Sequence, residues 1–212
     1  MSDLYPVFLK LKQQKCLVVG GGEVAARKVQ SLLACQADVY VISPQLHPPL
    51  SQFVAAGKIR AFQRPYQKED LAGAKLVIVA TEQKEVNQQV ASHCAEKGIL
   101  CNVVDEPELC DFFVPAVVKQ GPLKIAISTS GQAPVFAKQI RVNLTEHFDE
   151  AYKIVIEMVG RARTELLEKV SDATKRRKKI SSLQLEELVQ LYRSGGKEAL
   201  TQRINALLNL DA

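Results

Sequence analysis

A glycine-rich turn near the N-terminus is the sequence feature most able to do chemistry. It follows the apolar residues 16–19 and precedes residues 23–33, whose apolar positions recur at helical spacing. A strand, a glycine turn and a helix in this order form the first unit of a dinucleotide-binding fold. Gly20 would permit the tight turn, Gly22 would let the backbone approach a pyrophosphate, and Ala25 would be the third small position. A glycine turn that only joins a strand to a helix remains the alternative.

The surrounding pattern predicts the sheet that would carry this turn. Short runs rich in Val and Ile alternate with helical patterns, and the runs themselves show little alternation of polar and apolar residues. Parallel strands buried on both faces have this character. We therefore expect an α/β fold with a Rossmann-type, doubly wound parallel sheet. The expected strands are 16–19, 39–42, 59–62, 75–80 and 99–104, and the helices are 23–33 and 85–97.

The pattern changes near residue 111. Two strand-like runs, 112–119 and 123–128, flank the turn signal Gln120-Gly-Pro122. Pro134 suits the first turn of a helix, and the chain is almost entirely helical in pattern from there on. We expect amphipathic helices at 154–170 and 183–192, with a break at Ser194-Gly-Gly196 between the last two helices. The predicted domains are a nucleotide-binding domain at 1–112, a small mixed segment at 113–150 and a helical domain at 151–212.

Composition excludes several classes of protein. The chain has 212 residues, of which 47% are hydrophobic and 24% charged, as in globular proteins. Its apolar runs are too short to span a membrane, and its first residues do not form a secretory signal. The five cysteines are odd in number and lack C-x-x-C spacing, which indicates free thiols in a reducing cytoplasm.

Charge and histidine spacing say more about partners. The net charge of +5 is concentrated in the run Lys175–Lys179. Because no nucleic-acid motif accompanies this run, we expect no nucleic-acid partner. The run is then a solvated helix face or a docking surface for a polyanionic small molecule. The three histidines lie far apart in sequence, so we expect no preformed metal site.

The expected sheet places further polar residues beside the cofactor. In an open parallel sheet, ligands bind beyond the carboxyl ends of the strands. Thr81 follows the fourth expected strand and Asp105 follows the fifth, so both should face the cofactor, with Asp105 at its nicotinamide end. Asn102 could bond the carboxamide or the ribose. The alternatives are that Asp105 only caps the next segment and that Asn102 is a buried amide bonding the backbone.

The end of the second strand bears on the choice of cofactor. It reads Val41-Ile-Ser43-Pro44-Gln45, with no acid to bind the ribose hydroxyls and no arginine to bind a 2′-phosphate. Ser43 could hydrogen-bond the ribose, with Pro44 and Gln45 near the adenosine. This favours NAD over NADP.

Several motifs occur in a fixed order along nearly the whole chain, beginning at Tyr5-Pro-Val-Phe8. They resemble those of the precorrin-2 dehydrogenase family, the N-terminal module of siroheme synthase. The motifs are Gly20-Gly-Gly-Glu-Val-Ala-Ala-Arg-Lys28, Ala80-Thr81, Val86-Asn87, Cys101-Asn-Val-Val-Asp105, Phe113-x-Pro115 and Ser128-Thr-Ser-Gly-x-x-Pro134.

The resemblance implies an activity and an assembly. Members oxidise precorrin-2 to sirohydrochlorin with NAD+ in siroheme biosynthesis, and some also insert Fe2+ as ferrochelatases. They work as intertwined homodimers, which would make 113–150 a dimerisation segment. Asp105 would be the catalytic carboxylate, and Thr129 stands where some relatives have a serine that can be phosphorylated. By position, the resemblance implies that Glu23, Val24, Pro44 and Gln45 contact NAD. Together with the residues expected from the pattern itself, the cofactor-binding residues would be Gly20, Gly21, Gly22, Glu23, Val24, Ala25, Ser43, Pro44, Gln45, Thr81 and Asn102.

A tetrapyrrole with many carboxylates needs anion sites. The polar loop before the helix at Pro134 offers N–H groups for a substrate carboxylate, and it comprises Ser128, Thr129, Ser130 and Gly131. Two other functions stay open at this point. One is a non-catalytic NAD-sensing module whose helical tail binds a partner, and the other is a chelatase that uses the fold only as a scaffold.

Overall fold

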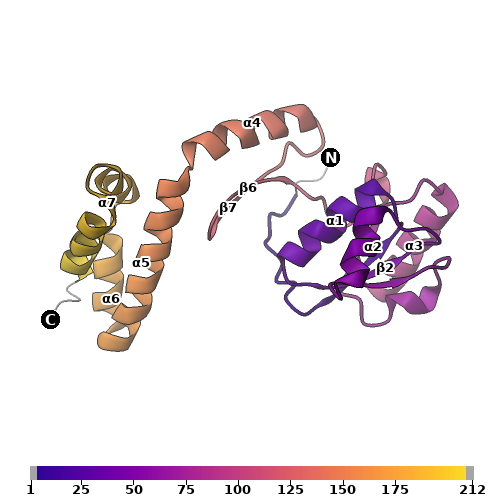
Figure 1. The fold of residues 1–212 in the computed structure, drawn as a ribbon, viewed down its shortest axis with the longest axis horizontal. Coiled ribbons are helices and arrows are strands. Elements are labelled where there is room, and N and C mark those ends of the chain that lie inside the picture. Colours follow the sequence, from indigo (N-terminus) through magenta and orange to yellow (C-terminus); the bar gives the residue numbers. More distant parts are fainter. Residues whose placement is uncertain (1–3, 209–212) are drawn as a thin grey trace. The chain divides into compact units, whose positions relative to one another are not determined.

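The computed structural model describes residues 4–208. The chain divides into two compact units, one of residues Tyr5–Val114 and one that begins at Pro115 (Figure 1). None of the helices within residues 4–208 combines the length and apolar character needed to cross a membrane. The two units are described in turn.

The first unit contains a five-stranded parallel sheet, which confirms the expected Rossmann-type fold. The strand order is β3-β2-β1-β4-β5. The strands after β1 are added on one side of it up to β3, and β4 and β5 are added on its other side, so the order reverses between β1 and β4. That reversal is the topological switch point where such sheets bind ligands. The strands are β1 (Lys15–Val19), β2 (Asp38–Ile42), β3 (Arg60–Phe62), β4 (Leu76–Val79) and β5 (Leu100–Val103).

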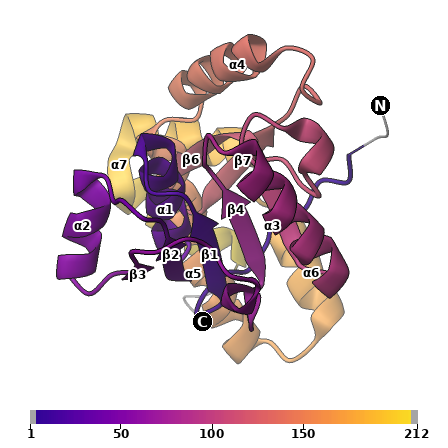
Figure 2. The ribbon, with the colours of Figure 1, turned by 90° about the vertical axis from the view of Figure 1, so that its right-hand side faces the viewer.

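Helices cover both faces of this sheet. Cys16 and Val18 of β1 pack in one core cluster with α1 (Glu23–Ala34), while Leu17 and Val19 pack in another with α3 (Lys84–Lys97). Helix α2 (Pro48–Ala55) lies on the same side of the sheet as α1. Figure 2 shows α1 and α2 on one side of the sheet and α3 on the other. Because every residue of β4 is buried, its sequence carries no alternation.

Local signals account for most element boundaries in this unit. Gly98 ends α3 in the left-handed conformation, with φ 63°. Helix α2, which the sequence analysis did not predict, starts with two prolines, residues that fit a first helical turn. Two 3-10 turns complete the unit, η1 (Lys68–Leu71) and η2 (Pro107–Leu109).

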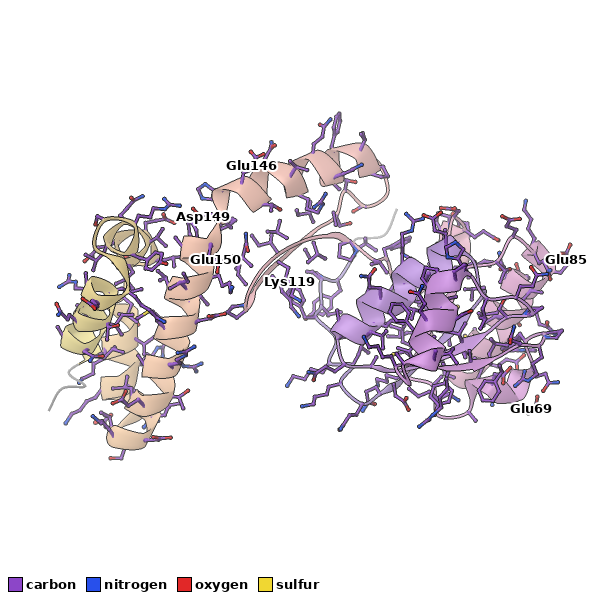
Figure 3. All side chains as sticks on the ribbon, viewed as in Figure 1. Glu69, Glu85, Lys119, Glu146, Asp149 and Glu150 are labelled. Carbon is purple, nitrogen blue, oxygen red and sulfur yellow. The ribbon has the colours of Figure 1, made fainter. Side chains whose placement is uncertain are left out.

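The second unit opens with a β-hairpin of β6 (Ala116–Gln120) and β7 (Leu123–Ile127). The expected strand at 112–119 was too long at its start, because Pro115 has no N–H to pair and residues 112–115 form no ladder. Gly121 at the turn has φ 54°, and a β-carbon there would lie 2.5 Å from the side chain of Lys153. The hairpin turn therefore packs directly on the helix that carries Lys153. Figure 3 labels Lys119 on this hairpin.

The rest of the unit is helical, as expected. It comprises α4 (Pro134–His147), α5 (Glu150–Lys169), α6 (Ala173–Ser181) and α7 (Leu185–Leu208). Asp149, labelled in Figure 3, caps α5 by accepting a bond from Ala151 N at 3.0 Å. Helix α7 is kinked at Gly196, with φ 69°, which confirms the expected break. The basic run Lys175–Lys179 lies on α6, which has no buried residue.

Two polar contacts hold α7 against the start of α5. The hydroxyl of Tyr152, a side chain only 2% exposed, donates to the Glu186 carboxylate at 2.9 Å. Burial and this carboxylate raise the pKa of Tyr152, so the phenol stays protonated and able to donate. Arg193 also pairs with Asp149 at 2.8 Å. The start of α5 is thereby tied to α7 at two points.

Candidate functional site

Gly20 makes the turn between β1 and α1. Its φ of 119° is a conformation that residues with a β-carbon rarely adopt, and its N–H donates to Ile42 O at 2.9 Å. A β-carbon at Gly20 would also overlap the carbonyl of Ala80, the residue directly after β4. Glycine is therefore required here for both backbone conformation and space.

Gly21 is the point where the loop after β2 closes over the turn. Its carbonyl accepts a bond from His47 N at 2.7 Å. A β-carbon would overlap the carbonyl oxygen of Gln45 and lie 2.6 Å from Ser43 Oγ. Ser43 is 8% exposed, whereas Pro44 and Gln45 are exposed. The structure thus brings Ser43 and Gln45, two of the three residues expected near the adenosine and its ribose, directly against the glycine turn.

Gly22 leaves an open surface at the start of α1. It is the N-cap residue, no side chain caps the helix, and nothing lies within 4 Å of where its β-carbon would be. The first amides of the helix, at Glu23, Val24 and Ala25, have no intrahelical acceptor. Ala25 is fully buried against the sheet, as expected of the third small position. Open space beside unbonded N–H groups at a positive helix end fits the pyrophosphate of a dinucleotide.

The loop after β4 carries Thr81 into a polar cluster. Thr81 Oγ1 donates to Asn87 Oδ1 at 2.6 Å. The Asn87 side chain in turn donates to Thr81 O at 3.2 Å and to Glu106 Oε1 at 2.7 Å. The hydroxyl of Thr81 is thus engaged within the protein, so any contact of Thr81 with the cofactor would come from its remaining atoms.

Asn102 holds the segment after β5. Its Nδ2 donates to Phe112 O at 2.9 Å, and the side chain is 7% exposed. Asp111 supports the same segment by accepting from Cys101 N at 2.9 Å. The geometry agrees with the alternative of a buried amide bonding the backbone. A role of Asn102 in binding the cofactor stays a prediction.

Asp105 stands exposed at the apex of the turn that follows β5. Its φ is 62°, and none of the hydrogen bonds within residues 4–208 uses its carboxylate. The preceding residue, Val104, is fixed by a bond from its N–H to Val79 O at 2.9 Å. A carboxylate so placed is free to accept a proton from a bound molecule.

Lys28 is a charged neighbour of this turn that the sequence analysis did not single out. It precedes the buried Val29 on α1, and it is itself partly buried. Burial and the charge of Arg27 lower the pKa of Lys28, while the charge of Asp105 opposes that shift. Its spacing of three residues from Ala25 was the available signal, since that spacing puts both residues on the face that packs on the sheet.

The loop expected to bind substrate carboxylates lies in the second unit. Ser128 Oγ accepts from Ser130 N at 3.1 Å, and Thr129 Oγ1 accepts from Ala133 N at 3.2 Å. Ser130 and Gly131 have left-handed backbones, with φ 51° and 78°. The four residues therefore form one compact turn before α4. Within residues 4–208, no three His, Cys, Asp or Glu side chains gather closely enough to hold a metal ion.

Known families match both units of the chain. Residues 7–116 match the family described as "Putative NAD(P)-binding", and residues 120–147 match that described as "Sirohaem biosynthesis protein central". A solved structure of SirC, a precorrin-2 dehydrogenase, matches with a TM-score of 0.76 and 26% identity, over 96% of this chain and 100% of that chain. The chain belongs to the precorrin-2 dehydrogenase and siroheme synthase family. The resemblance seen in the sequence motifs is thereby confirmed.

Curated relatives of the family are longer than this chain. The siroheme synthase of Methylobacillus flagellatus is 41% identical over 175 residues, which are 82% of this chain and 38% of the relative. That of Thioalkalivibrio sulfidiphilus is 35% identical over 206 residues, which are 97% of this chain and 42% of the relative. The chain thus spans about two fifths of the length of these siroheme synthases.

Proposed function

We propose that this protein oxidises precorrin-2 to sirohydrochlorin, with NAD+ as the hydride acceptor, in siroheme biosynthesis. The observation that carries the proposal is the exposed carboxylate of Asp105 beyond the carboxyl end of β5, in a parallel sheet whose glycine turn fits a dinucleotide. The family membership and the match to a precorrin-2 dehydrogenase structure support the same reaction. A non-catalytic NAD-sensing module would explain neither the similarity to precorrin-2 dehydrogenase and siroheme synthases nor a free carboxylate at this position.

The residues divide into those that bind and those that move protons. Bound NAD+ supplies a hydride acceptor. The amides of Gly22, Glu23 and Val24 would hold its pyrophosphate, and the loop at Ser43 would meet its adenosine ribose. Asp105 would accept the proton that the substrate loses as its hydride leaves. The loop from Ser128 to Gly131 would bind a substrate carboxylate through those backbone N–H groups that are not already bonded within the turn, as that of Ser130 is.

A direct assay tests the activity. Precorrin-2 is mixed with the protein and NAD+, and NADH is followed by its near-ultraviolet absorbance. We expect NADH to form in proportion to sirohydrochlorin. Conversion of precorrin-2 with no NADH, or NADH formation that does not depend on precorrin-2, would contradict the proposal.

Iron insertion is a separate question with its own assay. Fe2+ would be a substrate here, and Asp105 could take the pyrrole N–H protons as the metal enters. Sirohydrochlorin with Fe2+ in the absence of NAD+ isolates this step. Siroheme formed under those conditions would show that the chain also acts as a ferrochelatase. A chelatase that uses the fold only as a scaffold would give siroheme but no NADH from precorrin-2.

We also propose three domains: an NAD-binding domain at 1–112, a dimerisation segment at 113–150 and a helical domain at 151–212. In this proposal, residues 113–150 form the interface of a homodimer. Helix α4 supports this, because Val135 and Phe136 are 59% and 57% exposed and Ala137 is the one residue of α4 that is buried. Such apolar exposure is typical of a covered interface. Light scattering at micromolar concentration should give the mass of two chains, and a single-chain mass would count against the interface.

The five cysteines are all free thiols, which supports a cytoplasmic location.

A further inference from the structure

A buried amide joins the two loops that follow β4 and β5. Asn87, in the first turn of α3, is 3% exposed. Both of its side-chain hydrogens are used, one toward Thr81 O at 3.2 Å and one toward Glu106 Oε1 at 2.7 Å. Its oxygen accepts from Thr81 Oγ1 at 2.6 Å. A buried amide that is satisfied on all sides fixes the groups around it in one arrangement.

This linkage reaches the residue next to Asp105. Asp105 has a left-handed backbone, which side chains with a β-carbon rarely adopt unless the surrounding structure holds them there. On one side, Val104 N is bonded to Val79 O of β4 at 2.9 Å. On the other side, the Glu106 carboxylate is bonded to Asn87. The turn that carries Asp105 is therefore anchored on both flanks.

We propose that Asn87 and Glu106 are positioning residues that hold Asp105 in its working place. The inference rests on the proposed function, because it assigns Asp105 as the proton acceptor. Glu106 would act through its bond to Asn87 and not by taking a proton itself. A misplacement of about 1 Å is enough to lower the rate of a positioned reaction about 100-fold, so such anchors are expected to affect kcat.

Three variants separate positioning from other roles. Glu106→Ala removes the acceptor, whereas Glu106→Gln keeps an oxygen that can still accept from Asn87. Glu108→Ala is the matched control, because Glu108 is an exposed carboxylate on the same η2 turn. For each variant we would measure kcat and KM for precorrin-2, NAD+ affinity by calorimetry, and hydrogen exchange in the peptide 104–110. The exchange measurement needs neither cofactor nor substrate.

The expected results follow from the geometry. Glu106→Ala should lower kcat by about 10-fold to 100-fold and speed exchange at 104–110, with little change in NAD+ affinity. Glu106→Gln should retain most of the activity and protection, and Glu108→Ala should match the wild type. In a double-mutant cycle, Glu106→Ala should cost little further activity once Asp105→Asn is present, because both changes act on the same group.

Other results would overturn the inference. If Glu106→Gln lost as much activity as Glu106→Ala while keeping its exchange protection, the charge of Glu106 and not its anchoring would matter. If Glu106→Ala and Asp105→Asn had fully additive effects, Glu106 would not act through Asp105. If Glu106→Ala sped exchange without lowering kcat, the linkage would be structural only. A wild-type protein that forms no NADH would refute the proposed function itself, and positioning for that reaction with it, while exchange would still report on the linkage.

Discussion

The carbonyl oxygen of Gln45 occupies the space that a β-carbon on Gly21 would need. Through this contact, and the bond from His47 N to Gly21 O at 2.7 Å, the loop after β2 is held against the glycine turn. The two parts of the expected dinucleotide site, one for the pyrophosphate and one for the adenosine ribose, are therefore a single packed structure. Substitutions at neighbouring glycines should separate the stability of this structure from its ligand binding.

Gly21→Ala should destabilise the protein. The obstacle is backbone, which cannot rotate away as a side chain could, so the loop at 43–47 must shift. We expect a loss of about 1–3 kcal/mol in unfolding free energy and weaker NAD+ binding. Gly22→Ala is the matched control and should cost at most about 1 kcal/mol, the usual penalty of alanine at an N-cap, because its β-carbon would have no neighbour within 4 Å. Denaturant titration would measure the unfolding free energy of both variants. Equal stabilities of Gly21→Ala and Gly22→Ala would contradict the packing argument.

Gly22→Asp should abolish NAD+ binding and leave the fold intact. The site is open, and its φ of −81° suits any residue, so the side chain can be accommodated. The carboxylate would then repel the pyrophosphate from the start of α1. Calorimetry would measure the affinity, with Gln30→Asp on the exposed face of the same helix as a control for the added charge. Unchanged NAD+ affinity in Gly22→Asp would mean that the phosphate binds elsewhere.

The protein should use NAD+ in preference to NADP+, with mild discrimination. Ser43 offers a hydroxyl beside the glycine turn but no positive charge for a 2′-phosphate. Two arginines on and after β3 already have partners, since Arg60 pairs with Asp38 and Arg64 pairs with Asp70. Steady-state kinetics should give a higher kcat/KM with NAD+. A higher kcat/KM with NADP+ than with NAD+ would refute the role assigned to Ser43.

The Arg64–Asp70 pair should make stability depend on pH. Burial would raise the pKa of the Asp70 carboxyl, but hydrogen bonds from the Arg64 guanidinium and the Gln67 amide outweigh it and hold the pKa below its ordinary value of 3.8. Because the folded-state pKa is lowered, this stabilisation is complete well above pH 3.8 and is lost as pH falls through the folded-state value.

Asp70→Asn should therefore cost about 1–3 kcal/mol of unfolding free energy at neutral pH. The difference from the wild type should shrink at acid pH, where the wild-type carboxyl is also neutral. Urea titrations across the acid range would measure it. Glu69→Gln is a suitable control, since Glu69 is an exposed carboxylate beside Asp70 on η1. A difference that stays constant with pH would mean that the pair adds no charge-dependent stability.

Sequence patterns identified the first unit well because its elements are determined locally. The glycine turn, the strands without polar–apolar alternation and the helix expected at 85–97 each have a cause within a few residues. The same was true of the break at Gly196, where a glycine takes a left-handed backbone. Helix α2 was not predicted, because its opening prolines interrupt the periodic pattern.

Features that depend on contacts between distant residues could not be predicted in this way. Asn87 and Glu106 are 19 positions apart, and only the pairing of β4 with β5 brings them together. Lys28 becomes a neighbour of the Asp105 turn through the packing of α1 on the sheet. The pattern of each segment predicted which residues would be buried but not which polar groups would meet.

The catalytic carboxylate can be tested by one substitution that preserves the backbone. Asparagine tolerates the left-handed conformation of Asp105, with φ 62°, about as well as aspartate does, whereas alanine would add strain. Asp105→Asn also keeps size and hydrogen bonding while removing the basic lone pair. Any loss of activity in this variant therefore reports on proton transfer more cleanly than a loss in Asp105→Ala.

We expect dehydrogenation by Asp105→Asn to fall about 10²-fold to 10⁴-fold, the usual contribution of a positioned acid–base group. NAD+ affinity should change little, because the expected contacts lie at 20–24 and 43–45. Ferrochelatase activity, where present, should fall as well, since the same carboxylate would receive the pyrrole protons. Glu108→Gln, which neutralises an exposed carboxylate on the next turn, should leave all three measurements unchanged. Near wild-type NADH formation in Asp105→Asn would mean that the proton leaves to water or to a substrate carboxylate, and that Asp105 only shapes the turn.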